Sequence, residues 1–166
     1  MKRSAPAKAG PARAPAELGA PLEFMVTLLR LGHALERASV RMQGDLGVTA
    51  RQRMVLLCLA RRPELAGREL AELLDVDAAT FSLTVKRLEA AELVVRRRDP
   101  GDRRKLIMAL TPAGRAIVRK SSNTVEAAVA RFLKTVPAST SSRARAVIES
   151  LVAALDADAA ENDASA

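Results

Sequence analysis

The order of patterns between Val48 and Gly114 constrains the fold of this chain more than any other feature. Apolar residues there recur at helical spacing in two short segments and then fall into two strand-like runs. These four elements are expected at residues 67–74, 78–91, 93–98 and 105–110. Two helices joined by a three-residue connection predict a helix-turn-helix, and the strands predict a hairpin directly behind it.

Capping residues mark where the helices of this unit begin. Thr49 and Gln52 form a Thr-x-x-Gln capping box, which predicts a helix that ends before Pro63. Asp77 is suited to cap the second short helix of the pair. Thr111 is suited to cap a further helix behind the hairpin, with a proline in the first position, where a missing N–H costs little.

The hairpin combines an apolar face with a basic tip. The residues expected on the apolar face are Val95, Leu106, Met108 and Leu110. Pro100 and Gly101 suit the two central positions of a type II turn. The cations that crowd the tip are Arg96, Arg97, Arg98, Arg103, Arg104 and Lys105, offset by Asp99 and Asp102. Because like charges this dense repel one another, an external anion is expected to neutralise them, the alternative being a solvated edge that discourages strand aggregation.

The flanking segments read as helices, so the fold class is mainly α. Residues 22–43 and 112–156 carry apolar residues at helical spacing, and Gly44 to Gly47 are expected to end the first helix. The helix that begins at Pro112 is expected to continue through Phe132, with a last helix after Pro137. Residues 1–21 read as a disordered basic arm rich in Ala and Pro, and residues 157–166 as an acidic tail.

Composition narrows the partner and excludes several classes. The net charge of +8 favours an anionic partner, nucleic acid first and a membrane surface second. A single Cys and a single His exclude a disulfide framework and speak against a zinc site, so no cofactor or metal is expected. No phosphate-binding glycine loop or catalytic constellation is visible, so an enzyme is not expected. No apolar run is long enough to span a membrane, and the chain is expected to be cytoplasmic.

The helix at residues 78–91 has a polar outer face suited to the major groove of DNA. Hydroxyl groups can bond base edges there, and cations can reach phosphates. The residues expected to contact double-stranded DNA from this helix are Thr80, Ser82, Leu83, Lys86 and Arg87. The alternative is an ordinary solvated helix face. The basic hairpin favours DNA, since a narrow minor groove attracts arginine.

Five short motifs follow one another at the expected spacing across this region. They are Thr-Ala-Arg-Gln, Arg-Glu-Leu-Ala, Lys-Arg-Leu-Glu, Asp-Pro-Gly-Asp-Arg-Arg and Leu-Thr-Pro-Ala-Gly, which begin at Thr49, Arg68, Lys86, Asp99 and Leu110. In this order they resemble the MarR family of bacterial winged helix-turn-helix transcriptional regulators. The resemblance covers about two fifths of the chain and implies a winged helix-turn-helix core at residues 48–110 between dimerisation helices.

The resemblance also implies roles for individual residues. Base contacts are expected around Ser82, and minor-groove insertion from Arg104 with Arg103 beside it, supported by an ion pair between Asp102 and Arg104. Leu83 stands where relatives often have an arginine, so the preferred sequence is expected to differ. Glu92 replaces a usual glycine and would be strained in a left-handed conformation.

The same resemblance implies a homodimer, a palindromic operator and a small effector. Two recognition helices would then meet major grooves about 34 Å apart, whereas a monomer with a private helical cap is the alternative. The effector would be phenolic or otherwise anionic, with His33, Arg37 and Met54 as candidate contacts. Cys58 lies on the apolar side of its helix and is expected to be inert. A non-specific architectural DNA-binding protein is the alternative function.

Overall fold

The computed structural model describes residues 19–98, 101 and 106–164 of the chain. Two units are distinguished, Met1–Leu35 and Glu36–Ala166, and the boundary falls inside the first helix. The elements in chain order are α1 (Ala20–Leu46), α2 (Ala50–Arg61), α3 (Gly67–Leu73), α4 (Ala78–Ala90), β1 (Val94–Arg98), β2 (Leu106–Leu110), α5 (Pro112–Arg119), α6 (Val125–Leu133) and α7 (Ala138–Ala164). The mainly α fold with one hairpin agrees with the prediction.

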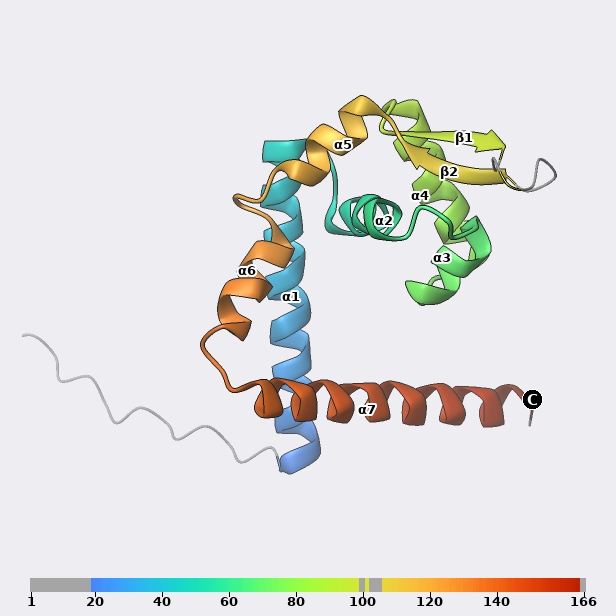
Figure 1. Cartoon of the computed structure of the whole chain (residues 1–166). Helices are drawn as coiled ribbons and strands as arrows, with labels where there is room; N and C mark the ends of the chain where they lie inside the picture. Colours follow the sequence, from blue (N-terminus) through green and yellow to red (C-terminus); the bar gives the residue numbers. More distant parts are fainter. Residues whose placement is uncertain (1–18, 99–100, 102–105, 165–166) are drawn as a thin grey trace, which may run out of the picture. The chain divides into compact units, whose positions relative to one another are not determined.

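The segment from α2 to α5 is called the winged lobe below (Figure 1). Its buried residues form a hydrophobic core cluster. The predicted inward faces are confirmed, because Val55, Leu56 and Leu59 of α2 and Leu70 of α3 are all buried. The buried residues of α4 are Phe81, Thr84, Val85 and Leu88. Leu93 and Met108 of the hairpin region complete the same cluster.

The caps predicted from sequence form as expected. Thr49 accepts a hydrogen bond from the Gln52 amide at 3.2 Å, and the Gln52 side chain accepts one from the Thr49 amide at 2.9 Å. Thr111 accepts one from the Gly114 amide at 3.0 Å, with Pro112 at the start of α5. These bonds satisfy backbone donors that would otherwise lack partners in the first turn.

The hairpin pairs antiparallel, and its apolar face differs by one residue from the prediction. Val94 pairs with Leu110 and is 3% exposed, whereas Val95 is 48% exposed. Because side chains alternate along a strand, this shift of one residue places Val94, not Val95, over the core beside Met108. The predicted turn residue Pro100 and the tip residues 99 and 102–105 lie outside the described residues.

The helix predicted to run from Pro112 through Phe132 is instead two helices. α5 ends at Arg119, and α6 begins at Val125 behind Thr124, whose side chain accepts from the Ala127 amide at 3.2 Å. Asn123 has a φ of +56°, a left-handed conformation that turns the chain between the two helices. The prediction was wrong because neither glycine nor proline marks this turn.

The boundaries of the flanking helices also differ from the predictions. α1 begins at Ala20 and runs past Gly44 to Leu46, because the positive φ of +73° that ends it belongs to Gly47. The acidic segment predicted as a separate tail from residue 157 is the last part of α7, which continues to Ala164. Residues 1–18 of the predicted arm lie outside the described residues.

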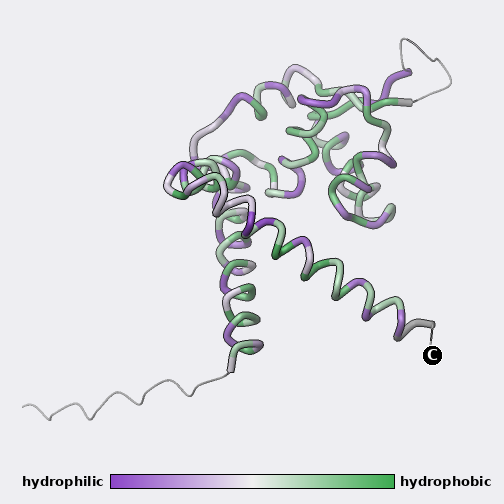
Figure 2. Tube along the Cα trace, turned by 60° about the horizontal axis from the view of Figure 1, so that its bottom comes forward, coloured by the Kyte–Doolittle hydropathy of each residue, from purple (hydrophilic) through white to green (hydrophobic). Residues whose placement is uncertain are grey.

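Hydrophobic residues recur along α1 and α7, as the colouring of the trace in Figure 2 shows. In the first unit the exposed apolar residues are Leu22, Phe24, Met25, Leu29, Leu31 and Leu35. In the second unit, those of α6 and α7 are Val129, Phe132, Leu133, Val147, Ile148, Val152 and Leu155. Among the described residues, no helix has the length and hydropathy needed to cross a bilayer.

Candidate nucleic-acid interface

α4 presents the outer face that the sequence predicted for major-groove contact. Asp77 caps the helix by accepting from the Thr80 amide at 2.8 Å, and hydrogen bonds from Thr80 hold the pKa of Asp77 below its usual range. Leu83 is 51% exposed, and Lys86 and Arg87 are exposed beside it. The outer face is therefore free of contacts from the lobe's own core.

The two predicted hydroxyl residues of α4 lie nearer the lobe than the cations do. Thr80 and Ser82 are each half-buried at the border of the outer face. Thr84 is buried, and its hydroxyl donates to the Thr80 carbonyl at 2.9 Å, so it is occupied within the helix. Residues 80, 82 and 83 therefore remain the ones predicted to contact base edges, and the exposed cations of the next turn the ones predicted to contact phosphates.

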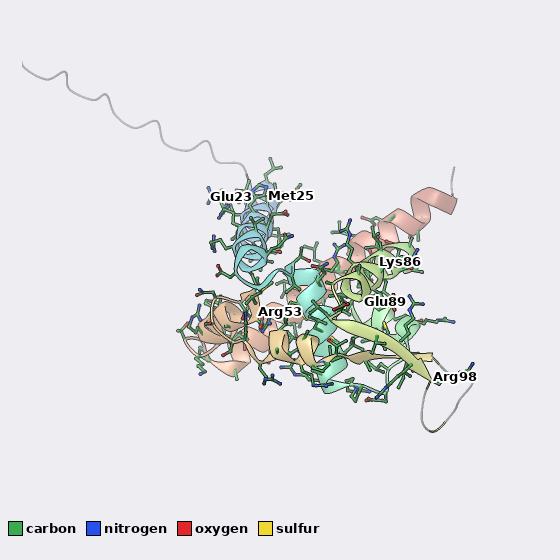
Figure 3. All side chains as sticks on the ribbon, turned by 90° about the horizontal axis from the view of Figure 1, so that it is seen from above. Glu23, Met25, Arg53, Lys86, Glu89 and Arg98 are labelled. Carbon is green, nitrogen blue, oxygen red and sulfur yellow. The ribbon has the colours of Figure 1, made fainter. Side chains whose placement is uncertain are left out.

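One arginine of the hairpin is held by the recognition helix. Arg96 donates through Nε to Oε1 of Glu89 at 2.8 Å, an ion pair that joins β1 to α4. Lys86 and Glu89 of α4 are labelled in Figure 3, together with Arg98 at the end of β1. This pair was not predicted, because the sequence pattern does not distinguish Arg96 from the other hairpin cations. Asp102, Arg103 and Arg104 lie outside the described residues, so their roles remain predictions.

The base of the hairpin is fixed to the start of α5 by two hydrogen bonds from Thr111. Thr111 donates from its amide to the Leu93 carbonyl at 3.1 Å and from its hydroxyl to the Glu92 carbonyl at 2.7 Å. At Gly114 of α5, a Cβ atom would collide with the Leu93 carbonyl oxygen. Glu92 itself has a φ of +56°, so the left-handed conformation considered from sequence is present. The Leu-Thr-Pro-Ala-Gly motif therefore anchors the hairpin to the lobe.

A buried arginine in α2 is the principal site that the sequence analysis missed. Arg53, labelled in Figure 3, is 2% exposed. Its side chain contacts Glu126 of α6. It also donates to two carbonyls at the end of α5, Ile117 at 2.8 Å and Lys120 at 2.5 Å. Its position one turn before the buried Leu56 and Leu57 was the available signal, since a cation on an apolar face needs buried partners.

The residues proposed for an effector are all exposed in this single chain. His33 lies in the first unit, whereas Arg37 and Met54 lie in the second. Cys58 is half-buried against the core, and burial raises the pKa of its thiol despite the opposing charge of Arg61. A thiol with a raised pKa is a poor nucleophile at neutral pH, as expected for an inert cysteine.

A helix-turn-helix with an attached hairpin and an uncovered recognition helix defines a winged-helix DNA-binding domain. The chain matches the model of the MarR family over residues 46–105. It is 30% identical to the HTH-type transcriptional repressor Rv2887 of Mycobacterium tuberculosis over 132 residues, which cover 80% of this chain and 94% of that relative. The chain belongs to the MarR family of transcriptional regulators, so it is not an enzyme.

Further comparisons agree with this membership. The HTH-type transcriptional repressor NicR of Pseudomonas putida is 36% identical over 96 residues, which cover 54% of this chain and 61% of NicR. CouR from Rhodococcus jostii RHA1, in a structure bound to p-coumaroyl-CoA, is 27% identical with a TM-score of 0.65, covering 78% of this chain and 90% of CouR. The S. aureus MepR–DNA complex shares the fold, with 17% identity, a TM-score of 0.66, and coverage of 80% and 97%.

Proposed function

We propose that this regulator is a homodimeric repressor that binds a palindromic operator and is released by a small phenolic or otherwise anionic ligand. The observation that carries this proposal is the outer face of α4, where exposed Leu83, Lys86 and Arg87 adjoin half-buried Thr80 and Ser82. That face offers apolar, hydroxyl and cationic groups within the reach of one groove. Two similar relatives, Rv2887 and NicR, are named as repressors.

Dimerisation is supported by the uncovered apolar residues outside the winged lobe. Phe132 of α6 is 62% exposed, and Leu155 of α7 is 59% exposed. Contiguous exposed apolar surface of this kind marks an interaction site in most soluble proteins. A second copy of the chain would cover it in a two-fold arrangement, and would present two recognition helices to two half-sites. A regulator that acts on bacterial DNA would work in the cytoplasm.

The ligand class is supported by one structural neighbour. CouR is described in complex with p-coumaroyl-CoA, a phenolic and anionic molecule. His33 and Arg37 would supply a hydrogen-bond donor and a cation to such a ligand, and Met54 an apolar contact. At saturation, the ligand should weaken operator binding by the ratio of its affinities for the DNA-free and the DNA-bound conformations of the protein.

Fluorescence anisotropy tests the operator. The full chain is titrated against duplex DNA from immediately upstream of its own gene and against a scrambled duplex, at two salt concentrations. Preference for the native duplex that persists at the higher salt is expected for a site-specific regulator. Equal binding to both duplexes that collapses with salt would instead favour the architectural alternative.

Two substitutions distinguish a residue predicted to read the base sequence from a residue predicted to hold the protein on DNA of any sequence. Ser82→Ala should change which duplex is preferred, because it removes a group at the base edges. Arg104→Ala should weaken binding to all duplexes alike, because the contact is largely electrostatic. Equal loss on every duplex for both variants would contradict this division.

A further inference from the structure

Arg53 occupies the point where three helices of the second unit meet. It extends from α2 to the last carbonyls of α5 and to the first turn of α6. The Arg53–Glu126 pair joins residues 73 positions apart, whereas pairs such as Arg68–Glu72 and Arg145–Glu149 join neighbours on one helix. The buried guanidinium therefore connects the winged lobe to the helix that leads into α7.

The chemistry of this contact fixes the orientation of α5 and α6 as well as the distance between them. The C-terminal carbonyls of α5 carry partial negative charge, and Arg53 donates to two of them. Its Nε donates to Oε1 of Glu126 at 2.6 Å. Because the guanidinium is planar and its donors point in set directions, it orients α5 and α6 together. An apolar side chain of similar size would fill the space but would allow the two helices to turn.

Besides the Arg53 contacts, the chain between α5 and α6 is held by an exposed side-chain contact in which Nδ2 of Asn123 donates to Oδ2 of Asp45 in α1 at 3.4 Å. Ser121, Ser122 and Asn123 are exposed, and Asn123 takes the left-handed conformation there. Thr124 is buried, but its side chain is engaged in capping α6 itself. An exposed turn of this kind can absorb changes in backbone angle, so the buried Arg53 contacts contribute to the direction of α6 together with the exposed Asn123–Asp45 contact.

We infer that Arg53 and Glu126 are positioning residues that set the separation of the two recognition helices, and thereby the spacer length that the regulator accepts between half-sites. This inference rests on the proposed homodimer and palindromic operator. Neither residue needs to touch DNA, because each acts by fixing the winged lobe relative to α6. Breaking the pair should leave a single half-site readable while the lobes lose their fixed separation.

The test measures how affinity depends on spacer length. The wild-type chain first selects its preferred inverted repeat from a random duplex library. Duplexes with the spacer shortened or lengthened by one base pair are then compared with the selected duplex, for wild type, Glu126→Gln and Arg53→Met. Glu64→Gln is the matched control, since it removes the same charge from the exposed Arg62–Glu64 pair. A duplex with one half-site and circular dichroism report half-site reading and folding.

For the wild type, changing the spacer should weaken binding about tenfold or more, comparable to losing one base contact in the site. In Arg53→Met and Glu126→Gln this penalty should fall to about threefold, with half-site affinity unchanged. Glu64→Gln should keep the full penalty. If Arg53→Met does not fold, the spacer penalty of Glu126→Gln tests the inference. This variant should fold because the glutamine keeps a neutral acceptor for the Arg53 Nε.

Lower thermal stability with an unchanged spacer penalty would show a merely structural pair and overturn the inference. A wild-type chain that is monomeric, or that selects no inverted repeat, would overturn the proposed function and this inference with it. Failure of this inference can therefore be told from failure of the proposed function, because in the first case the wild type still selects an inverted repeat.

Discussion

The winged lobe and the helices α6 and α7 bury their apolar residues to very different extents. In the lobe, Leu56, Leu70 and Leu88 are completely buried by residues of the same chain. In α6 and α7, Phe132 and Val147 remain 62% and 57% exposed, although apolar residues recur there at helical spacing as well. Among the described residues, the same sequence pattern thus packs against other parts of the chain in the winged lobe but stays exposed in α6 and α7.

Because of this difference, burial in the two regions would contribute to stability in different ways. A core enclosed by its own chain contributes at every protein concentration. An apolar face that needs a second copy contributes only when the copy binds, and its contribution therefore depends on concentration. Under the proposed function, the winged lobe reads DNA, and α6 and α7 bring two such lobes together.

The largest expected effect comes from introducing charge into the apolar face of α7. Ile148→Asp combined with Val152→Asp should prevent dimerisation, because carboxylates would have to be buried without partners. Operator affinity should then fall about hundredfold or more, since the second half-site no longer binds intramolecularly. Analytical ultracentrifugation and anisotropy on the selected operator measure the two effects.

The control for this variant lies on the opposite face of the same helix. Ser150→Asp combined with Ala153→Asp adds the same charge away from the apolar residues. It should keep both the dimer mass and the operator affinity. An equal loss of operator affinity in the two double variants would mean that the added charge, and not its place on the apolar face, is responsible. It would contradict the contrast between the winged lobe and α7.

A second effect should be confined to the winged lobe. Gly114→Ala places a Cβ atom against the Leu93 carbonyl oxygen, so α5 must shift away from the hairpin. The free energy of unfolding should fall by about 1–3 kcal/mol, the usual range for overpacking a close contact. Urea unfolding at a fixed protein concentration measures it.

Gly44→Ala is the matched control for that substitution. Gly44 lies within α1, and a Cβ atom there meets nothing within 4 Å. The change should stabilise the protein by about 1 kcal/mol, because alanine is the better helix former. The changes in the free energy of unfolding are expected to have opposite signs for the two substitutions. A loss of stability in both would contradict the packing argument.

The sequence predicted those parts of the fold that depend on near neighbours. The cap at Asp77, the box at Thr49 and the buried face of α4 all follow from residues a few positions apart. The exposure of Leu83, Lys86 and Arg87 could be predicted for the same reason, since it follows from the helical period. The strand face was shifted because Val94 and Val95 are equally apolar, and only packing against Met108 distinguishes them.

The parts that could not be predicted depend on contacts between distant residues. The break between α5 and α6 follows a turn with no glycine or proline, and Arg53 binds the two sides of that turn from α2. Periodicity cannot reveal that Arg53 and Glu126 are partners, because nothing in their spacing relates them. The lobe is therefore readable from local signals, whereas its connection to α6 is not.

A third and smaller effect concerns Glu92, which stands at the junction of α4 and the hairpin. With a φ of +56°, a non-glycine residue there is strained, so Glu92→Gly should stabilise the lobe by up to about 1 kcal/mol. Ala90→Gly, two residues earlier within α4, should destabilise it by a similar amount. Thermal unfolding of both variants decides, and destabilisation in each would show that the left-handed conformation is not strained.

The smallest effect is the pH dependence of the connection to α6. Burial raises the pKa of Glu126, but hydrogen bonds from Arg53, from its own backbone and from Thr124, together with the Arg53 charge, outweigh burial and lower it below its ordinary value of 4.5. A lowered pKa stabilises the fold above the unfolded value, and this stabilisation is lost as the pH falls through the folded value. The Glu126 side chain is 34% exposed, so solvent limits the contribution to within about 1 kcal/mol. The stability difference between wild type and Glu126→Gln should therefore be constant near neutral pH and shrink below pH 4.5, as urea unfolding across the acid range would measure. A difference that instead shrinks on the alkaline side would show that another group controls the link between the two regions.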